Sequence, residues 1–318
     1  MRIVRTQLKR VSVAVALATL FACSFTDPGE PEAAAPSSSP SSTTTPSSTS
    51  SPQPSVEATV AGARQTQAPM RFAVIGDFGT GDTIEQAIAQ RMCSRRTDHP
   101  FNLAFTTGDN VYPYGQRSRF GPAFFDPFRC LRNNGAEFHA SLGNHDWYTN
   151  EGRPELNEPA FGMKSRNYVI RRGGVRFVIA DSNVLDRDRL RAMLRPETGD
   201  GWTVVLFHHP VFSPGTRHGS TPGFRPGLPR MFQRWGVDLV FNGHDHIYAL
   251  SKPLHRIRYV VTGGGGAPLY GCRPAWFASR CVERHHFLYV VAREDRLIVK
   301  AVPSAGAPFD RFETSGRD

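Results

Sequence analysis

Short apolar segments recur along the chain from about residue 70 onward, and polar loops separate them. Continuous apolar runs of this length are typical of buried strands. Two of the segments flank the sequence Arg171-Arg-Gly-Gly174, which predicts a hairpin. The pattern predicts strands over residues 71–75, 102–107, 138–142, 168–170, 175–180, 202–207, 237–241, 257–261, 287–292 and 297–302.

Helical patterns lie between these strands, over residues 83–96, 118–130, 186–194 and 228–235. In the first of them Ile84, Ala87, Ile88 and Met92 recur at helical spacing, and Asp82 is placed to cap the helix. Strands that alternate with helices indicate the α/β (α+β) class. We expect a four-layer αββα sandwich, in which two mixed sheets pack together and helices cover the outer faces.

The first 23 residues have the order of an export signal. Basic side chains come first, and the apolar run Val11–Ala22 follows them. This run is too short to span a bilayer as a mature helix. The segment ends in Leu20-Phe-Ala-Cys23, which resembles a bacterial lipoprotein box. Three interpretations stay open: lipid attachment at Cys23, cleavage and release, or a buried N-terminal helix.

Residues 24–69 have the composition of a disordered tether. Between Pro36 and Ser55, 19 of 20 residues are Pro, Ser or Thr, and such a segment cannot bury enough apolar surface to offset its chain entropy. The predicted order is therefore a signal peptide (1–23), a tether (24–69) and one folded domain (70–318). We expect an exported protein, either an envelope lipoprotein or a secreted one, that touches the membrane only through a lipid anchor.

The chain carries 38 Lys and Arg against 28 Asp and Glu, a formal net charge of +10. Without the four basic residues of the predicted signal the balance is 34 against 28, or +6. Arginines cluster at residues 95–96, 171–172 and 187–195, but not in one stripe with interleaved aromatic residues. This scatter indicates solvated faces, so we expect no nucleic-acid partner. The sequence does not indicate an oligomeric state.

The chain has five cysteines. If Cys23 belongs to an anchor, the other four form an even set in an oxidising compartment. Proximity then pairs Cys272 with Cys281, which leaves Cys93 for Cys130. Four buried free thiols are the alternative.

Polar blocks that follow predicted strands contain the residue types of a metal site. They are Gly76-Asp-Phe-Gly79, Gly108-Asp-Asn-Val-Tyr112, Gly143-Asn-His-Asp146, Val205-Leu-Phe-His208 and Gly243-His-Asp-His246. Each block alone also fits a plain turn, a helix cap or one face of a strand. Ligand sites gather beyond the carboxyl ends of strands, so we expect the blocks to converge. Together they offer carboxylate, phenol, amide and imidazole donors, which suit Fe, Mn and Zn and suffice for two ions.

In this order the blocks resemble the calcineurin-like metallophosphoesterases, and the resemblance covers the whole predicted domain. Tyr112, three residues after Asp109, is similar to a tyrosine of the purple acid phosphatases. His208-His-Pro-Val211 and the last block look most like the small, single-domain, mammalian-type members. The resemblance implies a ferric ion, Fe(III), on Asp77, Tyr112 and His246, a divalent ion (Fe, Zn or Mn) on Asn144, His208 and His244, and Asp109 as a bridge between them.

The same resemblance implies an enzyme, a metal-dependent acid phosphatase that hydrolyses small phosphomonoesters with water activated at the two metals. His145 is expected to contact the substrate. His218 is expected to protonate the leaving group, with an ordinary loop histidine as the alternative, because it lies one residue further from His208 than the family places it. His209 is expected to be a spacer. Two other functions stay open: hydrolysis of phosphodiesters or nucleotides on the same metal core, and a non-catalytic envelope protein that binds metal.

Two further features concern the rim of the expected pocket. The glycines at 263–266 follow a predicted strand and resemble a loop near the metals, with a flexible turn as the alternative. Trp147 stands where the resemblance places a polar residue, so we expect the rim to differ there.

Overall fold

The computed structural model describes residues 68–197 and 201–316. The predicted signal peptide with Cys23, and the predicted tether up to residue 67, lie outside the described residues and stay predictions. Among the described residues, no helix has both the length and the apolar character needed to cross a membrane.

The first sheet has six strands in the order β13-β12-β11-β1-β2-β3. β1 pairs in parallel with β2 and antiparallel with β11, so the sheet is mixed. The strands are β1 (Met70–Ile75), β2 (Leu103–Thr106), β3 (Glu137–His139), β11 (His286–Ala292), β12 (Arg296–Pro303) and β13 (Asp310–Ser315).

The second sheet has seven strands in the order β10-β8-β9-β7-β6-β5-β4. The neighbours β9, β7, β6 and β5 run parallel, while β4, β8 and β10 pair antiparallel. The strands are β4 (Tyr168–Arg172), β5 (Val175–Ile179), β6 (Trp202–Leu206), β7 (Leu239–Asn242), β8 (Tyr248–Ser251), β9 (Arg258–Thr262) and β10 (Ala278–Val282).

Apolar side chains of both sheets meet in a central core. Phe72 of β1 and Phe105 of β2 belong to this core, where the Phe105 ring stacks on Phe177 of β5 with 4.2 Å between ring centroids. The alternate residues of β1, Ala73 and Ile75, pack in a second cluster with the helices. This alternation follows from the two-residue period of a strand. Each sheet therefore has two apolar faces, and both need a cover.

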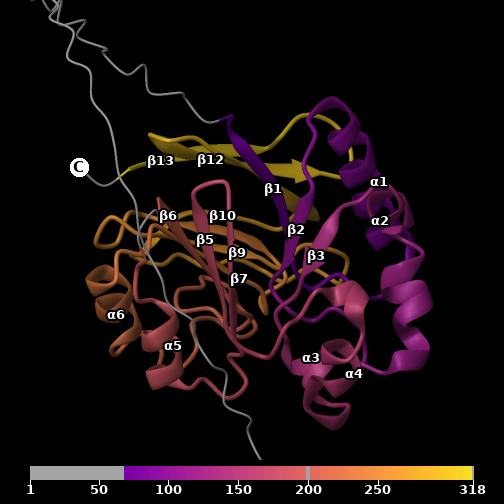
Figure 1. Ribbon diagram of the computed structural model, residues 1–318, viewed down its shortest axis with the longest axis horizontal. Helices are drawn as coiled ribbons and strands as arrows, with labels where there is room; N and C mark the ends of the chain where they lie inside the picture. The colour runs from indigo at the N-terminus through magenta and orange to yellow at the C-terminus, as the bar shows by residue number, and fades with distance from the viewer. Residues whose placement is uncertain (1–67, 198–200, 317–318) are drawn as a thin grey trace, which may run out of the picture. The chain divides into compact units, whose positions relative to one another are not determined.

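Helices cover the outer faces, as Figure 1 shows. α1 (Thr83–Asp98) and α2 (Arg129–Asn133) pack on the first sheet, and α5 (Arg187–Met193) and α6 (Leu228–Arg234) pack on the second. The predicted four-layer αββα sandwich is confirmed. Shorter pieces complete the described chain: α3 (Asn144–Trp147), α4 (Arg153–Leu156), a π-turn (Gly121–Phe125) and 3-10 turns (Arg117–Arg119, Asn150–Gly152, Pro159–Phe161).

The predicted helix over residues 118–130 is wrong. The segment holds a 3-10 turn and a π-turn before α2 begins. Pro122 and Pro127 lack the N–H group that a continuous helix requires. Phe124 and Phe128 are fully buried here. Packing of aromatic rings therefore decides the path of this segment.

The sequence pattern missed β8, β10 and β13. β10 and β13 are edge strands with several exposed polar residues, so they lack an apolar run. β8 begins two residues after the block that ends in His246. The third predicted strand also ends early, at His139, because the N–H of Ala140 leaves the sheet and donates to the Phe161 carbonyl at 3.0 Å.

The predicted cap of α1 is confirmed, but its buried face is rotated. The Asp82 side chain accepts from the N–H groups of Ile84 and Glu85, both at 3.0 Å. Ile84 is 40% exposed, whereas Glu85 is buried and accepts from the Gly81 N–H at 2.6 Å. Burial raises the pKa of Glu85 to about 9. The turn before the helix thus determines which face of α1 points inward.

The structure contains both predicted disulfides. Cys93–Cys130 joins α1 to α2 across 37 residues, and Cys272–Cys281 closes a loop of 9 residues. The alternative of four free thiols is wrong. Disulfides are typical of proteins in oxidising compartments.

Candidate metal centre

The predicted metal ligands lie beyond the carboxyl ends of parallel strands. Asp77 and Asp109 follow β1 and β2 of the first sheet, while His208 and His244 follow β6 and β7 of the second. Asn144 opens α3. With Tyr112 and His246, all seven side chains come together at one place, although they span residues 77 to 246.

One group of donors contains Asp77, Asp109, Tyr112 and His246. The Tyr112 hydroxyl lies 2.9 Å from Asp109 Oδ2 and 3.1 Å from His246 Nε2. His246 Nε2 lies 3.5 Å from Asp77 Oδ1. One ligand atom from each of Asp77, Asp109 and His246 lies within 4.8 Å of the others, a spacing that could hold a cation.

The other group contains Asn144, His208 and His244. Asn144 Oδ1 lies 3.0 Å from His208 Nε2 and 3.0 Å from His244 Nδ1, and the two ring nitrogens are 3.2 Å apart. His208 Nε2 is also 3.5 Å from Asp109 Oδ2. Asp109 therefore contacts both groups and lies between them.

Burial leaves the carboxylates without their usual solvation. It raises the pKa of Asp77 well above its ordinary value, and the negative charge of Asp109 raises it further. Burial also raises the pKa of Asp109, and it raises that of Tyr112, where the Asp109 charge adds to the effect. Acids gathered in this way favour a bound cation, because a cation offsets both the burial and the mutual repulsion.

Burial has the opposite effect on the imidazoles. It lowers the pKa values of His208 and His244, and it lowers the pKa of His246 to about 4. Neutral imidazole is the form that binds metals. His208 Nδ1 lies 2.9 Å from the Thr107 carbonyl and His246 Nδ1 lies 2.7 Å from the Pro268 carbonyl. These carbonyls accept the Nδ1–H protons and turn each Nε2 toward the centre.

The backbone is strained at three of the predicted ligands. Asp77, Asp109 and His244 have φ values of 56°, 52° and 73°, in the left-handed region that residues other than glycine rarely adopt. Such strain collects at functional sites, where surrounding contacts hold it. The His244 N–H donates to Asp77 Oδ1 at 2.9 Å, so one strained turn supports the other.

The donor set fits two metal ions. Ligands at about 2.0–2.1 Å from a metal lie roughly 3.0–3.4 Å from one another. The second group has this spacing, with 3.0, 3.0 and 3.2 Å between its three atoms. Lone pairs that face each other so closely repel unless a cation or a proton lies between them. Tyr112 and the carboxylates give the first group the harder, anionic donors that suit Fe(III).

The predicted catalytic histidines lie beside the two groups. The His145 ring is 4.4 Å from the Tyr112 ring, and its Nδ1 lies 2.7 Å from the Pro113 carbonyl. His218 is on the exposed rim, with its ring 4.2 Å from that of His244, and burial lowers its pKa. His209, expected as a spacer, packs 4.6 Å from the His244 ring and has its Nδ1 2.8 Å from Ser182 Oγ.

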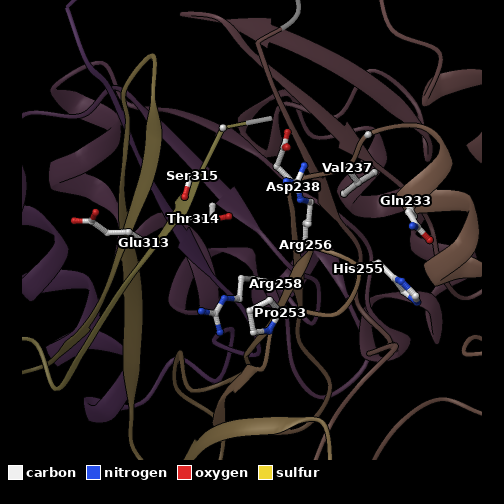
Figure 2. A pocket seen from close by; sticks show the side chains of 12 residues that line it. Gln233, Val237, Asp238, Pro253, His255, Arg256, Arg258, Glu313, Thr314 and Ser315 are labelled. Atoms are coloured by element: carbon white, nitrogen blue, oxygen red, sulfur yellow. The ribbon is translucent and has the colours of Figure 1, made fainter. Parts of the chain in front are cut away.

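A separate cavity of about 490 Å³ lies at the other end of β7 (Figure 2). Val237 and Asp238 line it and precede β7, whereas His244 follows that strand. Its other side is formed by Glu313, Thr314 and Ser315, from β13. The lining includes none of the predicted ligands. The cavity is thus distinct from the metal centre.

A family model for calcineurin-like phosphoesterases matches residues 70–248, more than half of the chain. The chain belongs to the calcineurin-like phosphoesterase family. This membership places it among the metal-dependent phosphoesterases, which are hydrolases.

The phosphoesterase is similar to purple acid phosphatases in sequence. Purple acid phosphatase 4 of Arabidopsis thaliana is 27% identical over 244 residues, which cover 65% of this chain and 71% of that protein. Purple acid phosphatase 3 of the same plant is 28% identical over 238 residues, which cover 63% and 64%. The closer likeness to mammalian-type members stays a prediction.

Solved structures share the fold. The purple acid phosphatase PPD1 from yellow lupin (Lupinus luteus) seeds has a TM-score of 0.68 at 18% identity, covering 78% of this chain and 54% of its own. GAP50, the anchor in the inner membrane complex of Plasmodium, has a TM-score of 0.67 at 14% identity, covering 79% and 90%. The chain spans about half the length of the lupin protein. Because the fold occurs in a phosphatase and in an anchor, the function depends on the site.

Asp146 of this phosphoesterase has a role that the sequence reasoning missed. Its buried carboxylate accepts from the Gly143 N–H at 2.8 Å, the Asn110 N–H at 2.9 Å and the Val111 N–H at 3.1 Å, and from Asn110 Nδ2 at 2.8 Å. It therefore joins the loop of Asp109 to the loop of Asn144.

Asp245 has a similar role on the other side of the centre. Its buried carboxylate accepts from the N–H groups of His218 at 3.1 Å and Gly219 at 2.9 Å, and from the Ser213 hydroxyl. It thus holds the rim loop that carries His218. Both Asp146 and Asp245 directly follow a histidine in a ligand block, and that position was the available signal.

The rim features also have defined places. Gly263 is buried, and a Cβ there would lie 2.2 Å from the Asp245 carbonyl and 2.9 Å from Asp77 Oδ2. This close packing favours the loop near the metals over a flexible turn. Trp147 donates its Nε1–H to Asp181 at 2.9 Å, and the Arg166 guanidinium lies 4.9 Å from its ring.

Proposed function

We propose that this phosphoesterase is an acid phosphatase that hydrolyses phosphomonoesters at a dinuclear metal centre. Asp77, Tyr112 and His246 would hold Fe(III), and Asn144, His208 and His244 would hold a divalent Fe, Zn or Mn ion. The observation that carries the proposal is the position of Asp109, whose Oδ2 lies 2.9 Å from the Tyr112 hydroxyl and 3.5 Å from His208 Nε2. A carboxylate in contact with both groups is what a bridging ligand requires.

Two metal ions in such a centre supply Lewis acidity and lower the pKa of coordinated water. The chain contributes the substrate contacts. The Pro113 carbonyl accepts the His145 Nδ1–H, and an N–H on Nε2 of the same ring would donate to a phosphoryl oxygen. His218 lies on the loop that Asp245 holds, and we propose that it gives its proton to the alkoxide oxygen of the leaving group.

We also propose that the protein is exported. Residues 1–23 have the order of a signal, and two disulfides occur in the domain. Lipid attachment at Cys23 and release after cleavage both agree with this proposal. Mass spectrometry of the mature N-terminus distinguishes the two.

The test combines metal analysis with two substrates. The purified protein should hold two metal ions per chain, and it should hydrolyse p-nitrophenyl phosphate faster than bis(p-nitrophenyl) phosphate. Turnover of the diester alone would overturn the substrate class. Metal bound without turnover of either ester would favour the non-catalytic alternative.

The visible absorption of the purified protein tests whether Tyr112 is a ligand of Fe(III). Fe(III) bound by a tyrosinate absorbs visible light, so Tyr112→Phe should abolish the band. Tyr259→Phe is the matched control, because Tyr259 is a buried tyrosine of β9 whose hydroxyl has no hydrogen-bond partner among the described residues. A band that survives Tyr112→Phe would contradict the role of Tyr112.

A further inference from the structure

Two exposed tyrosines stand next to the metal centre. Tyr114 is 55% exposed and Tyr148 is 63% exposed, and they are two of the five large apolar side chains exposed in the described part of the chain. Their rings meet edge to face, with 5.9 Å between centroids and 78° between planes. Tyrosine rings usually bury much of their area, so an exposed pair indicates a binding surface.

The pair continues inward to the predicted ligands. The Tyr148 ring lies 5.4 Å from that of His145, and the His145 ring lies 4.4 Å from that of Tyr112. Tyr112 in turn contacts Asp109 and His246. We call Tyr114, Tyr148 and His145 the aromatic shelf. It leads from the surface to the place where the phosphoryl group would bind.

Backbone contacts hold the shelf in place. The Tyr114 carbonyl accepts a hydrogen bond from the Thr149 hydroxyl, and the Gly115 N–H donates to the Val111 carbonyl at 2.9 Å. Gly115 has φ +68°, and a Cβ there would lie 2.6 Å from the Asp146 carbonyl. The loop of Tyr114 therefore packs directly against α3, which carries His145. These contacts hold the backbone that carries Tyr114 against the helix that carries His145.

We propose that the aromatic shelf binds the leaving group of the substrate, and that it selects phosphomonoesters whose leaving group carries a planar aromatic ring. This inference rests on the proposed phosphatase activity and adds a substrate class to it. A planar ring gains edge-to-face or stacked contacts with Tyr148 and Tyr114, whereas a saturated ring of the same size does not. A simple aryl group and a nucleobase share this chemistry, and the two differ in their distance from phosphorus.

The experiment compares matched pairs of substrates. Benzyl phosphate and cyclohexylmethyl phosphate have leaving groups of similar size and reactivity, but only the first has an aromatic ring. Adenosine 5′-monophosphate and ribose 5-phosphate form the second pair. For the wild-type protein, kcat/KM should favour the aromatic member of at least one pair by about 2- to 10-fold, the range of an aromatic contact. The pair that shows the preference identifies an aryl group or a nucleobase as the source.

The variants separate a binding surface from a structural one. Tyr114→Ala/Tyr148→Ala should reduce the aromatic preference to about one, while Tyr148→Phe should retain it, because the ring remains. Trp276→Ala is the matched control, since Trp276 is 67% exposed and packs against Phe212 and Phe277, outside the shelf. It should keep the preference.

The outcomes distinguish the inference from the proposed function. Hydrolysis of cyclohexylmethyl phosphate with no aromatic preference in either pair would overturn the shelf and leave the phosphatase proposal standing. A preference that survives Tyr114→Ala/Tyr148→Ala would also overturn it. No hydrolysis of any monoester would overturn the phosphatase proposal, and the inference with it.

Discussion

Removal of the metals should make the stability of this protein fall as the pH rises above about 6.5. The carboxylates of the centre are buried together, and burial raises the pKa values of Asp77, Asp109 and Asp146, the last to about 8. A folded-state pKa above the unfolded value means that the folded chain binds the proton more tightly. The stabilisation is complete below the unfolded value of 3.8 and is lost as the pH rises through the folded value, here about 8 for Asp146.

The histidines of the centre limit the pH range over which the carboxylates alone change the stability. Burial lowers the pKa values of His208, His244 and His246, so folding opposes their protonation. Their contribution is lost as the pH falls below the unfolded value of about 6.5. Below that pH the histidines and the carboxylates act in opposite directions. Between pH 6.5 and 8 the buried acids change. Glu85 and Glu155, whose pKa values burial raises to about 9, are not predicted ligands and lower the stability with or without metal, so the difference between the chelated and the metal-loaded protein reports the acids of the centre.

The structure supplies the expected magnitude. For Asp146 the interval from pH 6.5 to a pKa of about 8 corresponds to roughly 2 kcal/mol at 1.36 kcal/mol per pH unit. In a domain of this size that is a fall of about 4–8 °C in the melting temperature. Asp77 and Asp109 change in the same direction. Bound cations should remove the effect, because they favour the ionised carboxylates.

The assay is thermal unfolding of the chelated and the metal-loaded protein at pH 6.5 and 8. The chelated protein should lose about 4–8 °C or more between the two pH values, relative to the metal-loaded protein. Asp109→Asn, which removes one of the charges, should show a smaller fall after chelation. Equal pH dependence with and without metal would refute the claim that these buried acids depend on cations.

Asp109→Asn should lower the content of both metals together, measured by elemental analysis; loss of one metal alone would show that Asp109 is not the bridge. Removing the Cys93–Cys130 bond should lower the free energy of unfolding by about 4 kcal/mol, and removing Cys272–Cys281 should lower it by about 3 kcal/mol, because the two bonds restrict the entropy of unfolded loops with sequence separations of 37 and 9. Denaturant titration of the paired Cys→Ala variants measures both values. A larger loss for Cys272–Cys281 would contradict the loop argument. Asp245→Asn should lower the free energy of unfolding by about 1–3 kcal/mol and reduce kcat/KM, because it loosens the loop of His218; an unchanged kcat/KM would show that this loop does not take part in the reaction.

Periodicity identified most of the fold because the sandwich has a simple apolar pattern. Strands with both faces covered, such as β1 and β6, are continuous apolar runs, and they were found. Edge strands such as β10 and β13 have exposed polar positions and were not. The segment before α2 was predicted as a helix because its aromatic residues have helical spacing. Pro122 interrupts the helix, yet rings such as Phe124 remain buried, so the spacing alone does not reveal the break. The predicted buried face of α1 differs from the observed one because Glu85 turns inward to accept from the Gly81 N–H, a contact with the preceding turn that helical spacing does not show.

Ligand chemistry and strand patterns are both local properties, so residue types and apolar spacing are enough to show which donors are available for the metal centre and that they follow strands. Tertiary structure decided the rest. Only the folded chain brings Asp109 between Tyr112 and His208, because these contacts join loops from two different sheets. Neighbours distant in sequence also decide which loops Asp146 and Asp245 hold, and they place Tyr114 beside Tyr148. Burial and proximity are properties of the assembled layers, and they turn ordinary aspartates and histidines into a site with shifted pKa values and a defined approach for substrate.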